Sequence, residues 1–263
     1  MPALVRRTAA ALAVALGLSA PPALAQDTAT PLSSPGAAMD PEERALLRSE
    51  IRSYLLEHPE VIMEAIEVLE RRRRAAENEA EADLVARLAP ELFDDGYSFV
   101  AGNPEGDVTV VEFIDYQCGF CKRAHPEVRT LIESDPGLRY VVKEFPILGP
   151  ASRTAAEAAL AAMRQDDGRR YLAFNDALMA HDGQLSGDVV WEIADEVGLD
   201  VDRLRRDAGS DEVASMIDRT YSLARALRIE GTPTFVIGDR LVRGYVPLDR
   251  MRAAVAEIRA EEG

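Results

Sequence analysis

The sequence has few cysteines and fewer basic than acidic residues, and each shortage excludes a class of protein. With two cysteines in 263 residues, the chain cannot be a small fold held together by several disulfides, and it is long enough to bury a hydrophobic core without them. The 30 Lys and Arg residues against 46 Asp and Glu give a net charge of −16. A general nucleic-acid-binding protein is excluded, because such proteins gain most of their affinity by neutralising phosphates.

The N-terminal segment has the layout of a secretory signal. Two arginines precede an apolar run over residues 9–20, and an Ala-Leu-Ala sequence at 23–25 places small residues at the cleavage position. The run is too short to span the ~30 Å of a bilayer's hydrocarbon core. We expect residues 1–25 to be removed on export to an oxidising compartment such as the bacterial periplasm. No later stretch is apolar enough to span a membrane.

A helical arm is predicted to follow the signal. Residues 26–39 are rich in Ala, Thr, Ser and Pro without periodicity, which is typical of a flexible leader. Asp40 and Glu43 then form the pattern of a capping box, which indicates a helix start. The His58-Pro59 pair is expected to break or kink this helix, because the residue before a proline is disfavoured in the helical region. A second helix is predicted to run to about residue 89.

The arm carries an apolar stripe and then turns polar. We predict that residues 40–70 form a homo-oligomerisation element and that residues 71–90 form a stalk, so that the arm as a whole covers residues 40–90. The alternative is that the stripe packs back on the protein's own domain. The stripe consists of apolar residues at helical spacing: Leu46, Leu47, Ile51, Tyr54, Leu55, Ile62, Ile66 and Leu69.

The remainder of the chain, residues 91–263, is predicted to be one α/β domain. Its expected elements are strands at 108–114 and 138–145, a helical block over about 151–228, a hairpin at 234–237 and 241–242, and a closing helix at 247–261. Strands therefore flank one large block of helices. This order is typical of a mixed α/β sheet with an inserted helical subdomain.

The two cysteines, Cys118 and Cys121, lie where the first strand meets a predicted helix. A thiolate is favoured at a helix N-terminus by free N–H groups and by the helix dipole. The spacing allows Cys121 to reach the Cys118 sulfur, so the pair can alternate between dithiol and disulfide. We predict that Cys118 is the exposed sulfur that attacks and is attacked, and that the more buried Cys121 resolves the mixed disulfide.

The sequence around these cysteines resembles the DsbA-type branch of the thioredoxin superfamily. The resemblance rests on residues 111–121, on Pro126 and on Gly231-Thr232-Pro233-Thr234-Phe235, and it covers about residues 97–260. It implies a thioredoxin-like fold, a cis Thr232–Pro233 peptide bond, and disulfide exchange with cysteine-containing client proteins and a membrane redox partner, with no cofactor. Thr232 and the N-terminal arm resemble the disulfide isomerases and the ScsC-like group. Whether cells keep the pair oxidised or reduced stays open.

The resemblance also implies roles for other residues. Glu112 corresponds to a buried acid that moves protons to and from the second cysteine, the alternative being a solvent-facing glutamate at the edge of the strand. We expect Phe120, Thr232 and Pro233 to contact the client. Phe120 stands where the oxidants of this family often carry histidine. Lys143, in the second strand, is expected to lie on the surface.

Three other interpretations of the cysteine pair are open. A zinc or iron–sulfur site needs about four ligands, and only three histidines could supplement the two cysteines. A Cu(I) site is a stronger competitor because two soft thiolates suffice for that ion, and it would make the protein a copper carrier or a copper-stress protein. The third alternative is a scaffold in which the pair has no catalytic role.

Overall fold

The computed structural model describes residues 39–166 and 169–262. The predicted signal peptide at 1–25 and all but the last residue of the predicted leader lie outside the described residues. The chain divides into two compact units, Met1–Ile62 and Met63–Gly263. Each unit is described by itself below.

The described part of the first unit is dominated by helix α1 (Pro41–Glu57). Its start is the predicted capping box. The Asp40 carboxylate accepts hydrogen bonds from the N–H groups of Glu42 and Glu43 at 2.8 and 2.9 Å, and the Glu43 carboxylate accepts one from the N–H of Asp40. The helix ends at His58-Pro59, as predicted, and α2 (Glu60–Arg87) begins immediately afterwards. No residue of α1 is buried.

Helix α2 has 28 residues, of which only Val85 is buried. From Met63 onward it belongs to the second unit, where Val85 in its last turn packs in one cluster with Leu92 of α3 (Ala89–Phe93). Leu84 beside it is half-buried against the same cluster, and most of the other side chains of the helix are exposed. The pairs Glu67–Arg71 and Glu70–Arg74 lie at 3.7 Å, in the orientation that supports a solvated helix.

A five-stranded sheet forms the centre of the second unit, with the order β1-β3-β2-β4-β5. The strands are β1 (Phe99–Gly102), β2 (Val108–Ile114), β3 (Leu138–Glu144), β4 (Thr234–Ile237) and β5 (Arg240–Arg243). Strands β2 and β3 are parallel, and the other pairs are antiparallel. The strands predicted at 108–114 and 138–145 and the predicted hairpin are confirmed. Strand β1 was not predicted, because its four half-exposed residues carry too short a pattern.

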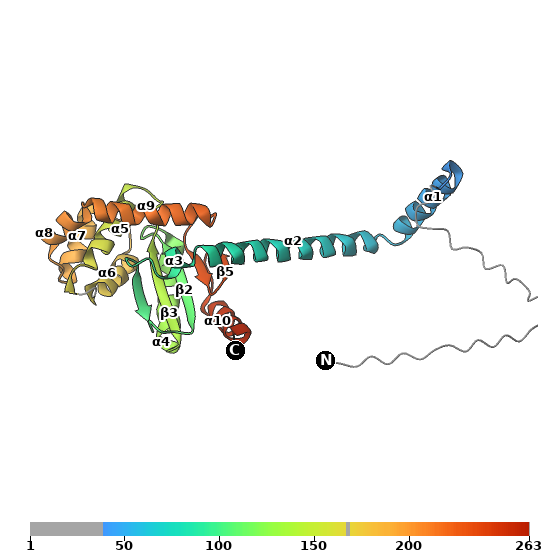
Figure 1. Ribbon diagram of the computed structural model, residues 1–263. Helices are drawn as coiled ribbons and strands as arrows, with labels where there is room; N and C mark the ends of the chain where they lie inside the picture. Colours follow the sequence, from blue (N-terminus) through green and yellow to red (C-terminus); the bar gives the residue numbers. More distant parts are fainter. Residues whose placement is uncertain (1–38, 167–168, 263) are drawn as a thin grey trace, which may run out of the picture. The chain divides into compact units, whose positions relative to one another are not determined.

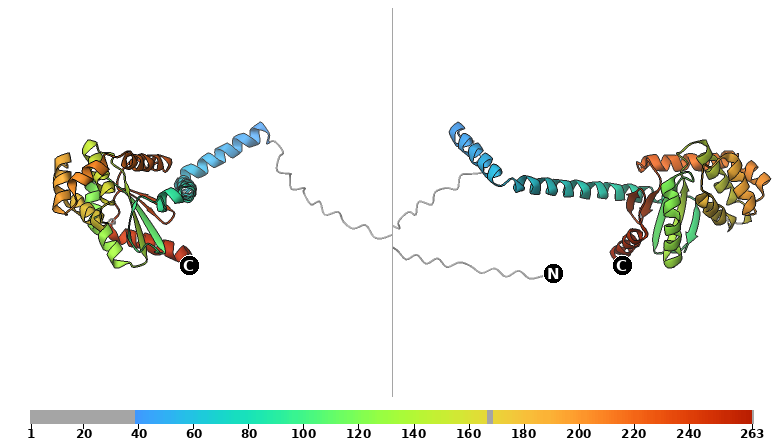
Figure 2. Two further views of the ribbon diagram at one scale, coloured as in Figure 1. Left: turned by 60° about the vertical axis from the view of Figure 1, so that its left-hand side comes forward. Right: turned by 180° about the vertical axis from the view of Figure 1, so that it is seen from behind.

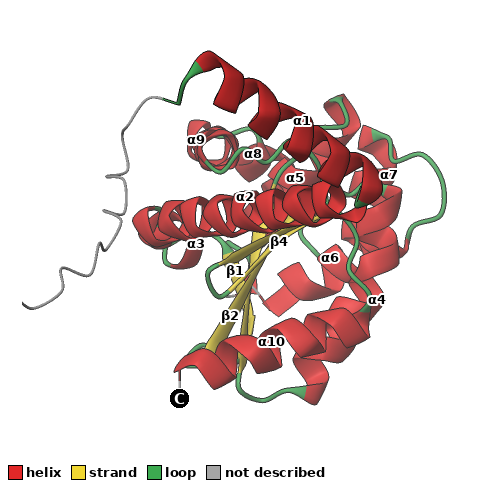
Figure 3. Cartoon of the chain, turned by 90° about the vertical axis from the view of Figure 1, so that its right-hand side faces the viewer, coloured by secondary structure: helices red, strands yellow, loops and turns green. Residues whose placement is uncertain are grey.

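Both faces of the sheet are covered by helices, and Figure 3 shows the strands between them. Alternate residues of β2 point to opposite faces. Val110 packs with α4 (Gly119–Ser134) and α10 (Leu248–Glu262), whereas Val111 packs with α3 and α9 (Asp211–Ala226). Because both faces are covered, six of the seven β2 residues are buried, which accounts for the nearly continuous apolar run in the sequence.

A block of helices is inserted between β3 and β4. It consists of α5 (Pro150–Ala162), α6 (Arg169–Ala180), α7 (Gly187–Glu196), α8 (Val201–Ala208) and α9. Helices α5 to α8 cluster beside one end of the sheet, and α9 runs from this cluster back over the strands (Figures 1 and 2). The predicted α/β class with an inserted helical subdomain is therefore confirmed.

The predicted surface placement of Lys143 is wrong. Its side chain is fully buried on β3, where Nζ donates to the Asp95 carboxylate at 2.6 Å and to the backbone carbonyl of Glu91 at 2.7 Å. Helix α3 supplies the Glu91 carbonyl, and the segment between α3 and β1 supplies the Asp95 carboxylate. A buried ammonium group is tolerated there because it is paired and hydrogen-bonded. The sequence of β3 alone does not show that this segment returns over the strand.

Candidate functional site

The two cysteines lie at the start of α4, immediately after the central strand β2. Cys118 is the N-cap residue and Cys121 lies in the first turn, as predicted. The connecting turn is anchored by Asp115, whose carboxylate accepts hydrogen bonds from the N–H groups of Ile147 and Leu148 at 2.8 and 2.9 Å. The loop after β3 thus fixes the place where the helix begins.

The environment of Cys118 includes a loop from far along the chain. The two cysteines are not bonded to each other, and their exposed fractions are 7% for Cys118 and 0% for Cys121. Cys118 is therefore the more accessible of the two, as predicted. The prediction that it is exposed is wrong, because only 7% of its surface is in contact with solvent. Its sulfur lies 3.1 Å from the backbone carbonyl oxygen of Thr232, and the Thr232–Pro233 peptide bond is cis, as the resemblance predicted.

The local hydrogen bonds favour a thiolate at Cys118. The hydrogen bond from the Cys121 thiol lowers the pKa of Cys118 to about 5, assisted by the N–H groups of Cys121 and Phe120 and opposed by burial. These N–H groups are the free donors of the α4 N-terminus. At neutral pH Cys118 is accordingly ionised, which is the form that attacks a disulfide.

Cys121 has the opposite character. Burial raises the pKa of its thiol far above the ordinary value, and the neighbouring Cys118 and the charge of Glu112 raise it further. Cys121 therefore cannot ionise at neutral pH without a base beside it. The two cysteines, three residues apart, thus differ in protonation at neutral pH: Cys118 is a thiolate and Cys121 is a protonated thiol.

Glu112 is a buried carboxyl group beside this pair. It lies on β2, is 2% exposed, and accepts a hydrogen bond of 2.5 Å from the Tyr140 hydroxyl. Burial raises the pKa of Glu112 to about 8, the hydrogen bond from Tyr140 opposes this rise, and the charge of Cys118 adds to it. The buried placement is the one that the resemblance implied. A carboxyl with this pKa exchanges protons near neutral pH.

A second buried carboxyl group, Glu144, was not predicted. Its Oε1 accepts hydrogen bonds from Tyr116 and Tyr171, both at 2.7 Å, and Asn175 donates to the Tyr116 hydroxyl at 3.0 Å. Burial raises the pKa of Glu144 to about 8. This network joins helix α6 to the turn before Cys118. The sequence carries no signal for it, because the partners lie 27 and 28 residues from Glu144.

The residues expected to contact the client lie in two places, at the loop against Cys118 and in the first turn of α4. Thr232 and Pro233 form the loop against Cys118, whereas Phe120 projects into solvent with 59% of its surface exposed. Between residues 88 and 262, Phe120 and Leu148 are the only described large apolar side chains with high exposure. Leu148 follows β3 and was missed, because an isolated leucine in a loop gives no pattern.

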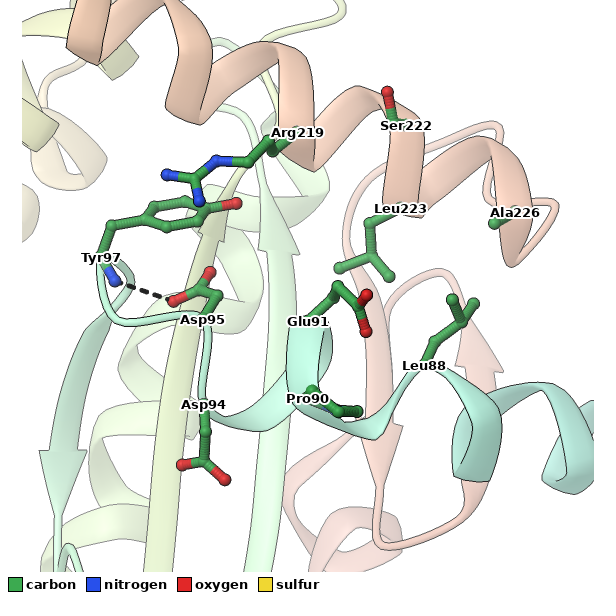
Figure 4. Close-up of a pocket in the computed structure, with 10 residues that line it drawn as sticks. All are labelled: Leu88, Pro90, Glu91, Asp94, Asp95, Tyr97, Arg219, Ser222, Leu223 and Ala226. Atoms are coloured by element: carbon green, nitrogen blue, oxygen red, sulfur yellow. Dashed lines mark hydrogen bonds between the residues drawn. The ribbon is translucent and has the colours of Figure 1, made fainter.

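A cavity of about 510 Å³ lies elsewhere, between α3 and α9 (Figure 4). Neither cysteine lines it. The Arg219 guanidinium stacks over the Tyr97 ring at 4.1 Å, and Asp95 beneath it belongs to the Lys143 ion pair. Arg219, Tyr97 and Asp95 thus already have partners within the protein, and the cysteine pair lies elsewhere. Its lining residues are Leu88, Pro90, Glu91, Asp94, Asp95, Tyr97, Arg219, Ser222, Leu223 and Ala226.

The metal interpretations find no further ligand in the described ranges. Within residues 39–166 and 169–262, no group of three or more His, Cys, Asp and Glu side chains is arranged to hold a metal ion. His125, four residues after Cys121, lies instead 2.8 Å from the Asp176 carboxylate.

The low pKa of Cys118 leads to a direct prediction. In the reduced protein the thiolate absorbance at 240 nm is expected to rise with a midpoint near pH 5, because the Cys121 thiol and backbone N–H groups stabilise the anion. Since this pKa lies below that of an unfolded cysteine, about 8.5, the thiolate's contribution to the stability of the reduced protein is fully present above about pH 8.5. It is lost as the pH falls through 5. A midpoint above pH 8 would contradict the assignment, and Cys118→Ser is the blank.

Comparison with family models gives two matches. Residues 109–256 match the DSBA-like thioredoxin domain, and residues 43–76 match the N-terminal domain of the copper resistance protein ScsC. The first match contains both cysteines, Glu112 and the Thr232–Pro233 loop. The second lies within α1 and α2.

Known proteins with similar sequences or structures include two solved structures and one antiporter. A thioredoxin-like oxidoreductase from Silicibacter pomeroyi is 46% identical, with a TM-score of 0.62, over 66% of this chain and 98% of that one. A linker-deletion mutant of Proteus mirabilis ScsC is 25% identical, with a TM-score of 0.63, over 86% and 99%. A Na⁺/H⁺ antiporter NhaA from Salinispora tropica is 32% identical over 203 residues, which are 73% of this chain but 30% of that protein. No helix in the described part of this chain is long and apolar enough to cross a membrane.

Proposed function

Because the chain belongs to the family of DsbA-like thioredoxin domains, we propose that it is a periplasmic thiol–disulfide oxidoreductase that exchanges its Cys118–Cys121 disulfide or dithiol with client proteins. The observation that carries the proposal is the division of the cysteine pair into a thiolate at a helix N-terminus and a buried thiol beside a carboxyl group. The predicted signal at residues 1–25 supports the compartment. A membrane protein that resets the redox state of the pair is the proposed partner.

The proposed exchange proceeds in two steps. The Cys118 thiolate attacks a client disulfide, one client sulfur leaves as a thiolate, and a mixed disulfide forms. Glu112 then takes the proton of Cys121, the Cys121 thiolate attacks the Cys118 sulfur, and the second client sulfur leaves as a thiolate. The client gains two electrons and the cysteine pair loses two. In the oxidising direction every step reverses, and Cys121 recovers its proton from Glu112.

Client binding is assigned to the surface around Cys118. An extended client segment would lie against the loop of Thr232 and Pro233, where backbone groups can pair with it as an added strand. The exposed ring of Phe120 offers apolar contact beside the sulfur.

The arm is proposed to assemble copies of the chain. The match of residues 43–76 to the ScsC N-terminal domain supports this role. So does the exposure of the apolar stripe, in which Ile51, Ile62 and Ile66 keep 50%, 47% and 43% of their surfaces in contact with solvent. Several active sites held together could act on the disulfide bonds of one misfolded client, as a disulfide isomerase requires.

Trapping of the mixed disulfide tests the proposed exchange. Cys121→Ser keeps the attacking thiolate but removes the resolving thiol, so a Cys118-linked adduct with a reduction-sensitive bond is expected to accumulate on incubation with scrambled ribonuclease. The adduct would be measured by non-reducing electrophoresis and mass spectrometry. Cys118→Ser is the matched control, since it retains Cys121 and is expected to form no adduct.

The same experiment distinguishes disulfide exchange from the copper-carrier alternative. If neither wild type nor Cys121→Ser forms an adduct, while reduced wild type binds Cu(I) tightly through both thiolates, the protein is a copper carrier. If the adduct forms through Cys121 in the Cys118→Ser protein, the assignment of the attacking sulfur is wrong.

A further inference from the structure

We propose that Tyr140 is a positioning residue for the proton transfer between Glu112 and Cys121, acting through the hydrogen bond that its hydroxyl donates to the Glu112 carboxylate. The inference rests on the proposed thiol–disulfide exchange and assigns a residue that neither the sequence pattern nor the resemblance indicated.

The sheet register brings the two side chains together. Glu112 of β2 pairs with Val142 of β3, and Tyr140 lies two residues before Val142 on the same face. Diagonal neighbours on parallel strands are within reach of a long side chain. The hydroxyl oxygen of Tyr140 lies 2.5 Å from Oε2 of Glu112.

The hydroxyl of Tyr140 has one partner among the described residues, and that partner is Glu112. Tyr140 is 6% exposed. A buried hydroxyl is costly unless it is hydrogen-bonded, so its orientation is determined by the carboxylate that accepts from it. Phenylalanine would fill the same space without this cost. The presence of tyrosine is therefore explained by the bond to Glu112 and not by packing.

Few titratable groups surround Glu112. Strand β3 contributes Tyr140, and the start of α4 contributes Cys118 and Cys121. Strand β4 places an apolar residue, Phe235, at the register position beside Glu112. Helix α10 lines the same core with apolar side chains. The next titratable group outward is a second phenol, that of Tyr116, which lies in the same core cluster as Tyr140.

Within this group of residues, Tyr140 acts as a permanent donor. Burial and then the charge of Glu112 raise the pKa of its phenol well above the ordinary value, so the hydroxyl keeps its proton throughout the pH range in which Glu112 titrates. Donation to the carboxylate stabilises the ionised form of Glu112 and lowers its pKa, against the effect of burial. Glu112 therefore stays available as a base at a lower pH than burial alone would allow.

Loss of the Tyr140 hydroxyl is expected to affect the two directions of the exchange oppositely. In the mixed disulfide, Glu112 must be ionised to accept the proton of Cys121, so resolution is faster above its pKa. Without the Tyr140 hydroxyl the pKa of Glu112 rises, and resolution slows at neutral pH. In the reverse reaction, protonated Glu112 returns the proton to Cys121, so loss of the hydroxyl keeps that direction fast up to a higher pH.

Tyr140→Phe tests the inference in the full-length protein. Stopped-flow mixing of reduced protein with glutathione disulfide separates bimolecular attack by Cys118 from unimolecular resolution by Cys121. The variant is expected to shift the pH midpoint of resolution upward by about one unit, which slows it about tenfold below the midpoint. The attack phase and the high-pH plateau are expected to stay within about twofold of wild type. Combining the variant with Glu112→Gln is expected to add nothing to Glu112→Gln alone.

The matched control is Tyr171→Phe. It also removes a buried hydroxyl that donates to a buried glutamate, but that glutamate is Glu144. It is expected to leave the midpoint of resolution unchanged. An unmoved midpoint in Tyr140→Phe, or an equal shift in Tyr171→Phe, would overturn the inference. If wild type forms no mixed disulfide at all, the proposed exchange itself fails.

A measurement on unsubstituted Tyr140 covers the case in which Tyr140→Phe does not fold. With ¹³C-labelled tyrosine, one ring-carbon resonance is expected to shift with the same pH midpoint as resolution, and this shift is expected to be absent in Glu112→Gln. If every tyrosine resonance that titrates in wild type also titrates in Glu112→Gln, Tyr140 does not report on Glu112 and the inference is wrong.

Discussion

Replacing Cys118 with serine is expected to abolish thiol–disulfide exchange, with a loss of at least about 10³-fold in insulin reduction and ribonuclease reactivation. Exchange proceeds only by attack of a thiolate on a disulfide sulfur, and a serine hydroxyl is neither ionised at neutral pH nor able to form such a bond. Cys121 cannot substitute, because it is fully buried and its pKa is raised far above the ordinary value. The chain has no other thiol.

The fold is expected to survive this substitution, since serine replaces sulfur with a smaller atom at the edge of the core. Circular dichroism and thermal unfolding of the reduced proteins provide the control. An exchange rate within tenfold of wild type in Cys118→Ser would show that the cysteine pair is not the reactive centre. A wild type that binds Cu(I) and exchanges no disulfides would instead favour the carrier.

Replacing Ile51 or Ile66 with aspartate is expected to convert an oligomer into single chains. Burying an isoleucine side chain contributes about 1.5–3 kcal/mol, and an interface repeats this contribution in every copy. A buried, unpaired carboxylate adds a further cost. The dissociation constant is therefore expected to rise at least about 10²-fold for either substitution. Light scattering after size-exclusion chromatography measures the mass.

The matched control for the arm is Ser49→Asp, which adds the same charge to an exposed position on the opposite side of α1. It is expected to keep the mass of wild type. Both Ile51→Asp and Ile66→Asp are expected to keep attack on glutathione disulfide within about twofold, because neither isoleucine belongs to the core cluster that holds the cysteine pair. If the wild type is monomeric at all concentrations, the proposed assembly through the arm is wrong.

Local patterns in the sequence predicted most of the elements that carry the site. The apolar run at 108–114 is β2, and the capping box at Asp40 and Glu43 starts α1. These predictions succeeded because caps, breaks and strands that are covered on both faces depend on neighbouring residues. Strand β1 was not predicted, because a short edge strand is stabilised by its pairing with β3 and its own sequence pattern is too short to indicate a strand.

Lys143 shows where a local pattern misleads. A single lysine in an apolar strand was expected on the surface, yet Asp95 and the Glu91 carbonyl pair with it in the interior. These acceptors come from a segment about 50 residues earlier, and their positions follow from the path of the chain over the sheet. A residue's own neighbours in sequence contain no information about such a partner.

The sequence by itself determined that this protein has one redox-capable pair of cysteines, at the junction of a strand and a helix, and that Glu112 precedes it on that strand. Only the tertiary structure decided which groups set the chemistry of the pair. The carbonyl of Thr232 lies 114 residues from Cys118, and the hydroxyl of Tyr140 lies 28 residues from Glu112. The physical reason is that a pKa depends on burial and on atoms within hydrogen-bonding distance, and it is strand register and loop packing that bring those atoms together.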